Sequence, residues 1–158
     1  MDKLHAKYIK FVNTGGDLGA ASELKLAKDA VVLKQTGVVH EHVTSDNPNP
    51  EDVTEIGTNY EIRGVLAAAS QAHMVEILGG AENSSVYTKS QAIRTLPKKD
   101  IRLAVYRKTD GLLVLKDLTN MTFVPEVEES YESGKQFYLP FVAKSTATTD
   151  YTSDNSAV

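Results

Sequence analysis

Residues 61–80 read EIRGVLAAASQAHMVEILGG, and their pattern changes in the middle. The first part alternates as a strand does, because polar Glu61 and Arg63 flank the apolar Ile62. Residues 66–78 are instead rich in alanine and have the spacing of an amphipathic helix. The predicted apolar stripe, which packs on a sheet, consists of Ala67, Ala68, Met74, Val75 and Leu78. Gly79 permits the left-handed conformation that ends many helices, so the pattern predicts one helix directly after a strand.

Outside this helix, the sequence predicts short antiparallel strands separated by turns rich in glycine and Asx residues. Predicted strands cover residues 4–12, 58–65, 101–106, 112–115, 120–127 and 136–143, with two more extended segments within residues 23–43. Pro125 and Pro140 fall inside the last two strands, which places them at edges or bulges because proline donates no ladder hydrogen bond. These elements predict a mainly β fold, a β-sandwich or small barrel of antiparallel strands formed by residues 1–145, with the helix flanking it.

Two polar segments are predicted to lie outside the strands. Residues 44–52 contain Pro48 and Pro50 among Asx residues, which favours an exposed loop. Residues 146–158 read TATTDYTSDNSAV and hold few apolar side chains, so we expect a loosely ordered C-terminal tail.

Composition narrows the function classes. The 158 residues suit one domain, and 17 basic against 21 acidic residues give a net charge of −4, which argues against a surface dedicated to nucleic acid. The chain has no cysteine, which excludes disulfides and thiolate chemistry. No segment approaches the roughly 20 apolar residues of a membrane span, and the N-terminus lacks the apolar core of a signal peptide. We therefore expect a protein made in a cytoplasm and not inserted in a membrane.

The candidate ligand sites are all incomplete. His40-Glu41-His42 places two imidazoles on one side of a strand, but a third metal ligand is not visible. The glycine-rich segment 15–19 lacks the lysine and the spacing of a phosphate loop. Residues 46–52 offer oxygen atoms without the ligand order of a calcium loop. We expect no metal and no cofactor.

The acidic run at residues 126–132 is the strongest charge feature. Glycoside hydrolysis needs two carboxylates that face one cleft, and adjacent glutamates in a strand and turn do not imply that arrangement. The sequence therefore predicts no enzyme, although a pocket with a perturbed carboxylate among Glu126, Glu128, Glu129 and Glu132 would reopen this class. A monomeric binding module that uses residues 46–52 as its ligand loop also stays open.

The order of the predicted strands and helix resembles that of a known protein family. Residues 54–80, TEIGTNYEIRGVLAAASQAHMVEILGG, and residues 117–145, DLTNMTFVPEVEESYESGKQFYLPFVAKS, resemble the tail tube proteins of long-tailed bacteriophages. The resemblance implies a helix-flanked β-sandwich that joins copies of itself into six-fold rings. The rings would stack into a hollow tube for DNA ejection, contact other tail proteins at its ends, and let DNA pass without specific binding. The protein would then be a structural part of the virion, made in the host cytoplasm.

The resemblance also suggests roles for individual residues. Residues 39–56 would reach the adjacent ring, and the candidate inter-ring loop consists of Asn47, Pro48, Asn49, Pro50, Glu51 and Asp52. Alternation with apolar neighbours makes Glu23, Lys25, Glu61 and Arg63 candidates for the surface of the lumen. The alternative is another virion interaction protein of similar size, such as a head decoration protein or a tail terminator.

Overall fold

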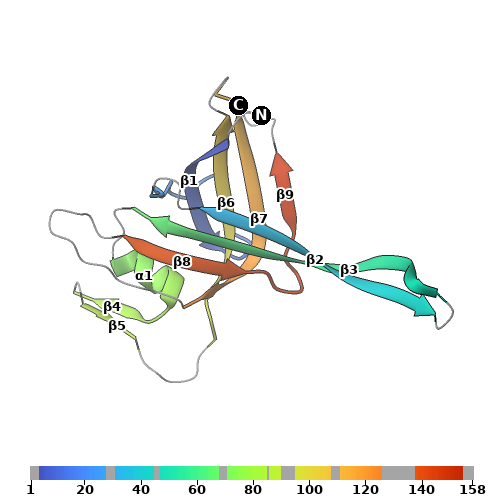
Figure 1. Cartoon of the computed structure of the whole chain (residues 1–158). Helices are drawn as coiled ribbons and strands as arrows, with labels where there is room; N and C mark the ends of the chain where they lie inside the picture. Colours follow the sequence, from blue (N-terminus) through green and yellow to red (C-terminus); the bar gives the residue numbers. More distant parts are fainter. Residues whose placement is uncertain are drawn as a thin grey trace.

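The computed structural model describes residues 4–27, 31–44, 47–67, 71–84, 86–89, 95–107, 111–125 and 138–154. The described chain is mainly antiparallel β structure with one helix, which confirms the predicted fold class. Its elements are β1 (Leu4–Asn13), β2 (Val32–Thr44), β3 (Asn47–Leu66), α1 (Gln71–Leu78), β4 (Ala81–Asn83), β5 (Val86–Thr88), β6 (Lys98–Arg107), β7 (Leu113–Val124), β8 (Leu139–Lys144) and β9 (Tyr151–Asp154). Figure 1 shows a strand-built body from which β2 and β3 project as a long arm.

Seven strands form one sheet. Its order is β1-β6-β7-β8-β3-β2, and the seventh strand, β9, pairs with β7 outside this order. The segment around Leu24 closes this sheet into a barrel. Ile9 of β1 exchanges both backbone hydrogen bonds with Leu24, and two further backbone bonds around Leu26 join the same segment to the end of β3. The described sheet edge at β1 is thereby covered, which removes a row of unpaired backbone groups.

The core fills the inside of this barrel and includes three phenylalanine rings. Phe11 makes edge-to-face contacts with Phe123 and Phe141, with ring centroids 5.1 and 5.5 Å apart. Aliphatic side chains from β1, β3, β6, β7 and β8 complete the core; the largest of those that are fully buried are Ile9, Ile62, Leu66, Ile101, Leu118, Met121 and Leu139. Side chains alternate along these strands, so one face of the sheet is buried inside the barrel and the other faces solvent.

The predicted helix exists but begins later than expected. The structure continues β3 to Leu66 and starts α1 at Gln71, while Ala67 lies in a turn and Ala68 is outside the described residues. Leu78 is buried and Met74 packs against the core, as predicted, and Val75 is half-buried. Ile77, which the predicted stripe omits, is fully buried and belongs to the same core cluster.

Gly79 ends the helix as expected. Its φ of 74° is left-handed, and its backbone N–H donates to the Val75 carbonyl at 3.0 Å. The small sheet of β4 and β5 follows, and the Tyr87 hydroxyl donates to the Gly79 carbonyl at 2.6 Å. Together α1, β4 and β5 form a small layer against one side of the body (Figure 1). No described helix has the length and apolar character needed to cross a bilayer.

A bulge in β7 corrects the prediction of two separate strands there. Residues 112–115 and 120–127 were expected to be different strands, but β7 is continuous from Leu113 to Val124. Its pairing with β6 shifts register near Asn120, which has a positive φ of 52°. The extra residue lets both Leu118 and Met121 face the core although they are an odd number of positions apart.

Asp100 holds this bulge in place. It is buried, and its two carboxylate oxygens accept hydrogen bonds from the backbone N–H groups of Asn120 at 2.8 Å and Gly15 at 3.1 Å. One side chain therefore satisfies backbone donors from the β1 turn and from β7.

The C-terminal segment is more ordered than predicted. Residues 151–154 form β9, which pairs with β7, and Tyr151 stacks on Tyr60 with ring centroids 5.4 Å apart. Hydroxyl groups of Thr146 and Thr149 donate to the Asn120 carbonyl at 3.0 and 3.2 Å. The expectation of a loose tail overlooked that polar residues can add to an open strand edge. Residues 155–158 lie outside the described residues.

Candidate functional site

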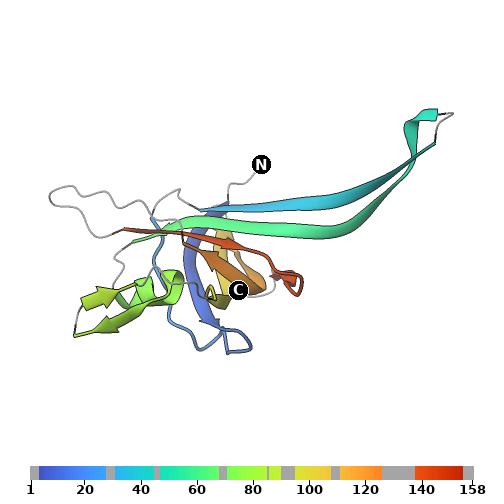
Figure 2. The same cartoon turned by 90° about the horizontal axis from the view of Figure 1, so that it is seen from below.

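The arm is formed by the parts of β2 and β3 that extend beyond the body. β3 pairs with β8 only from Glu61 to Leu66, whereas its earlier residues pair with β2 alone. In Figure 2 the two strands run away from the body together as a narrow ribbon. β2 is also the last strand in the order of the large sheet, so neither outer edge of the arm has a partner among the described strands.

The arm changes the interpretation of residues 47–52. These residues were predicted to be an exposed loop, but they form the beginning of β3, where Asn47 pairs with Thr44 and Asp52 pairs with His42. Proline-containing strands are compatible with this position because the arm has no neighbour on either outer side among the described strands. Asn49 is exposed; the side chains of the other candidates, Asn47, Pro48, Pro50, Glu51 and Asp52, lie outside the described part of the chain.

Large apolar side chains on the arm are open to solvent. The exposed fraction is 54% for Val39, 53% for Val53 and 68% for Ile56. Val39 pairs with Glu55 and Glu41 pairs with Val53, so these four residues share one face of the ribbon. We call the exposed residues Val38, Val39, Val53 and Ile56 the apolar arm residues. Their exposure in a subunit with a closed core is typical of an interaction surface.

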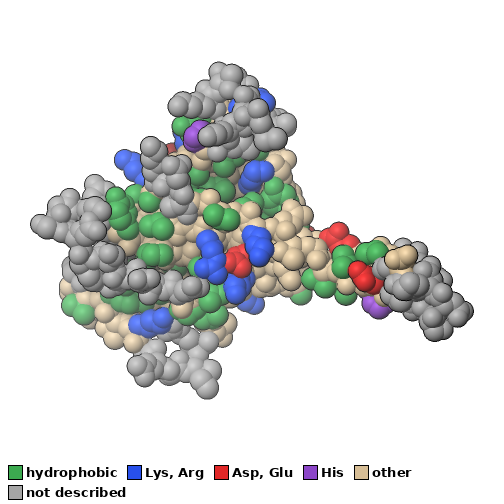
Figure 3. Space-filling model, viewed as in Figure 1, with side chains coloured by type: hydrophobic (Ala, Val, Ile, Leu, Met, Phe, Trp, Pro, Cys, Tyr) green, Lys and Arg blue, Asp and Glu red, His purple; other side chains and the backbone are tan. Residues whose placement is uncertain are grey.

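At the base of the arm, a charged row crosses three neighbouring strands. Lys34 of β2 pairs with Glu61 of β3, which also pairs with Lys144 of β8. The Arg63 guanidinium donates a hydrogen bond to Glu61 within an ion pair. Figure 3 shows basic side chains gathered around an acidic one near the point where the arm leaves the body. We call Lys34, Arg63 and Lys144 the basic cluster.

Glu61 is the single carboxylate of this row. The hydrogen bond from Arg63 lowers the pKa of Glu61 below its usual value of 4.5, with further lowering by the charges of Lys144 and Lys34. Glu61 therefore stays ionised to a lower pH than an isolated glutamate does, and its charge offsets part of the charge of the basic cluster.

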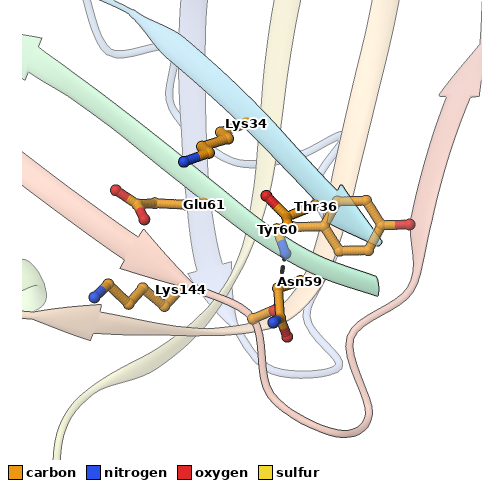
Figure 4. Close-up of a pocket in the computed structure, with 7 residues that line it drawn as sticks. Lys34, Thr36, Asn59, Tyr60, Glu61 and Lys144 are labelled. Carbon is orange, nitrogen blue, oxygen red and sulfur yellow. Dashed lines mark hydrogen bonds between the residues drawn. The ribbon is translucent and has the colours of Figure 1, made fainter. Parts of the chain in front are cut away.

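A shallow pocket of about 340 Å³ lies beside the row. It is lined by Lys34, Thr36, Asn59, Tyr60, Glu61, Lys144 and Ser145. In Figure 4, Lys34 and Lys144 lie on either side of Glu61. The pocket thus contains hydroxyl, amide and ammonium donors, which suits an anionic ligand better than an apolar one.

The structure brings together two of the four lumen candidates. Glu61 and Arg63 form the ion pair described above, on the outer face of the barrel wall. Glu23 and Lys25 are exposed on the segment that closes the barrel, where their neighbours Leu24 and Leu26 pack against the core. Their assignment to a lumen stays a prediction.

Sequence reasoning missed Lys34 and Lys144 because they join Glu61 only through the pairing of β2, β3 and β8. Residues in such a row are distant in sequence, and no local spacing reveals their proximity. A register prediction for the three strands would have found both lysines. Asp100 was missed for a related reason, since its two partners belong to other strands and turns.

The other sequence candidates have structural explanations or fall outside the described chain. The glycine-rich segment forms a turn in which Gly15 donates to Asp100 and Gly19 donates to the Asp17 carboxylate at 2.9 Å. His40 and Glu41 are exposed, and the described residues include no group of three or more ligands that could hold a metal. The side chain of His42 and the acidic run 126–132 are outside that description.

Comparison with known proteins gives no family assignment. No protein-family model matches the sequence. No curated protein matches it either.

Proposed function

We propose that this protein is a structural subunit of a bacteriophage tail tube. In this proposal, copies of the chain form six-fold rings that stack into a hollow tube through which DNA is ejected. Its partners are other copies of itself and the tail proteins at the two ends of the tube. DNA passes through the lumen without sequence-specific binding, and the role of the subunit is structural rather than catalytic.

The projecting arm is the observation that carries the proposal. A two-stranded ribbon without a core of its own is marginally stable in water, so a long one gains most from packing on another surface. The apolar arm residues supply that contact area, and the free edge of β2 supplies unpaired backbone groups. Both features support contact between the arm and another protein surface.

A ring with stacked neighbours accounts for the position of these features. The arm extends beyond the body (Figure 2), so it can pack on the body of a neighbouring copy, and this contact is heterologous unless the neighbour's arm returns it. An arm that packs against a different patch of the next copy makes a heterologous contact, which generates rings or open helical stacks. Residues 39–56, predicted to reach the adjacent ring, include the apolar arm residues Val39, Val53 and Ile56.

The test is whether the purified protein assembles, and whether assembly depends on the arm. Negative-stain electron microscopy at high protein concentration, paired with light scattering for mass, should reveal rings or hollow tubes of uniform width. The triple variant Val39→Ser, Val53→Ser, Ile56→Ser should remain a folded monomer and lose assembly. Val86→Ser is the matched control, because Val86 is 61% exposed but lies on β5, away from the arm.

Two results would contradict the proposal. A triple variant that assembles as well as the original protein would remove the arm from the interface. A protein that stays monomeric at all concentrations and salts, and instead binds phage heads or a completed tail end, would favour a decoration protein or a tail terminator.

A further inference from the structure

The basic cluster at the base of the arm forms part of a site that the tube proposal leaves without a role. We propose that the pocket beside Lys34 and Lys144 binds a phosphate-bearing anion. This inference concerns one subunit and does not depend on assembly into rings. It rests on the charge of the row, the unsatisfied donors around the pocket, and the pocket size.

The charges in the row do not balance. Three cations, Lys34, Arg63 and Lys144, surround one carboxylate, although the chain as a whole carries a net charge of −4. Arg63 is engaged with Glu61. Within the described part of the chain, neither the Lys34 nor the Lys144 ammonium group forms a hydrogen bond or ion pair. Two ammonium groups therefore remain for a ligand.

The pocket adds neutral donors between these charges. Ser145 Oγ accepts a hydrogen bond from the Tyr60 backbone N–H at 3.0 Å, which leaves the hydroxyl proton of Ser145 free to donate. The hydroxyl of Thr36 and the amide of Asn59 also line the pocket. The ring of Tyr60 stacks on that of Tyr151, with centroids 5.4 Å apart, which restricts the movement of this wall of the pocket.

A phosphate group matches these donors in charge and in size. A phosphate monoester carries close to two negative charges at neutral pH and three strong acceptor oxygens, which suits two lysines plus hydroxyl and amide donors. A volume of about 340 Å³ is at the lower end for ligand pockets, which fits one or two phosphate groups rather than a whole nucleotide.

The row of basic residues continues past the pocket. Lys144 pairs with Thr122 of β7, and Thr122 pairs with Lys98 of β6, so Lys98 belongs to the same row on the outer face. A line of lysines can also contact successive phosphates of a polymer. The phosphate group could then come from a small free compound or from a nucleic acid backbone.

The test uses isothermal titration calorimetry of the full chain with pyrophosphate at low salt. Lys34→Ala and Lys144→Ala should each weaken binding by about fivefold, the scale of one exposed ion pair. Glu61→Gln should tighten binding, because it removes the only carboxylate of the row. Lys7→Ala is the matched control, since Lys7 is an exposed lysine on β1 outside the pocket and should leave binding unchanged.

A second titration with a short DNA duplex distinguishes the two sources. Competition between DNA and pyrophosphate, with the same dependence on Lys34 and Lys144, would identify backbone phosphates as ligands. Binding of pyrophosphate alone would identify a small phosphate compound. The proposal is overturned if neither ligand binds, or if Lys7→Ala weakens binding as much as the two pocket variants do.

Discussion

The body and the arm use the same kind of strand for opposite purposes. In the body, strands close into a barrel and bury rings such as Phe123 completely. In the arm, β2 and β3 keep their ladder of hydrogen bonds but leave side chains such as Ile56 in solvent. We therefore expect the arm to contribute much less than the body to the free energy of folding, because apolar burial supplies the dominant favourable term.

This difference separates two kinds of measurement. Unfolding of the monomer should report almost entirely on the body, whereas assembly should report on the arm. Substitutions of similar chemistry in the two regions test whether the stability of the monomer depends on the body alone.

The largest expected effect comes from the aromatic core. Phe123→Ala should lower the free energy of unfolding by about 3–5 kcal/mol, because it opens a cavity between Phe11 and Phe141. Ile56→Ala in the arm should change it by no more than about 0.5 kcal/mol. Urea unfolding of the monomer measures both. Similar losses for the two variants would show that the arm belongs to the cooperative unit of the body.

The second largest loss of stability is expected at the buried carboxylate of the body, Asp100. Asp100→Ala leaves the backbone N–H groups of Gly15 and Asn120 without their acceptor and should cost about 2–3 kcal/mol. Glu55→Ala removes an exposed arm carboxylate that accepts a hydrogen bond from Thr58, and we expect a change within about 0.5 kcal/mol. A neutral Asp100→Ala would mean that water replaces the lost acceptor.

Two glycines of β3 give a closer comparison on a single strand. A Cβ at Gly64 would lie 2.8 Å from Phe141 Cζ, so Gly64→Ala should cost about 1–3 kcal/mol through overpacking. A Cβ at Gly57 would meet no atom within 4 Å, and Gly57→Ala should change stability by no more than about 0.5 kcal/mol. Thermal unfolding of both variants checks this pair. Equal losses would contradict the difference in packing along β3.

The smallest effect concerns the junction between the two regions. The pKa of Glu61 is lowered by Arg63, so its ionised form stabilises the fold above the usual value of 4.5, and this contribution is lost as the pH falls through the folded pKa. Wild type and Glu61→Gln should therefore differ in stability near neutral pH and converge in strong acid. Unfolding curves across that range measure the difference; a gap that widens toward low pH would contradict the sign.

Local patterns were sufficient for most of the body. Alternation predicted β1 and β6, and the alanine-rich stripe with Gly79 predicted the helix and its end. The start of the helix was misplaced because β3 continues to Leu66, where pairing with Leu139 overrides the local helical spacing. Pairing with a distant strand cannot be predicted from the sequence of a single segment.

Other features needed partners that are distant in sequence. In the sequence, Asn120 resembles a strand boundary because asparagine is common at turn positions with a positive φ. In the structure it does have a positive φ, but it lies in a bulge inside β7 that Asp100 stabilises. Pro48 and Pro50 indicated a loop, yet an edge strand of the arm accepts them. The basic cluster was invisible because Lys34 and Lys144 meet Glu61 only across strands.

The continuity of β3 has a mechanical consequence. One strand runs from the outer part of the arm to Leu66, where it is joined both to β8 and to the segment that closes the barrel. Antiparallel hydrogen bonds lie perpendicular to the strands, so a pull along β3 loads the pairs between Glu61 and Leu66 together and in shear. Tension applied to the arm is thus spread over the barrel wall rather than separating its bonds one at a time.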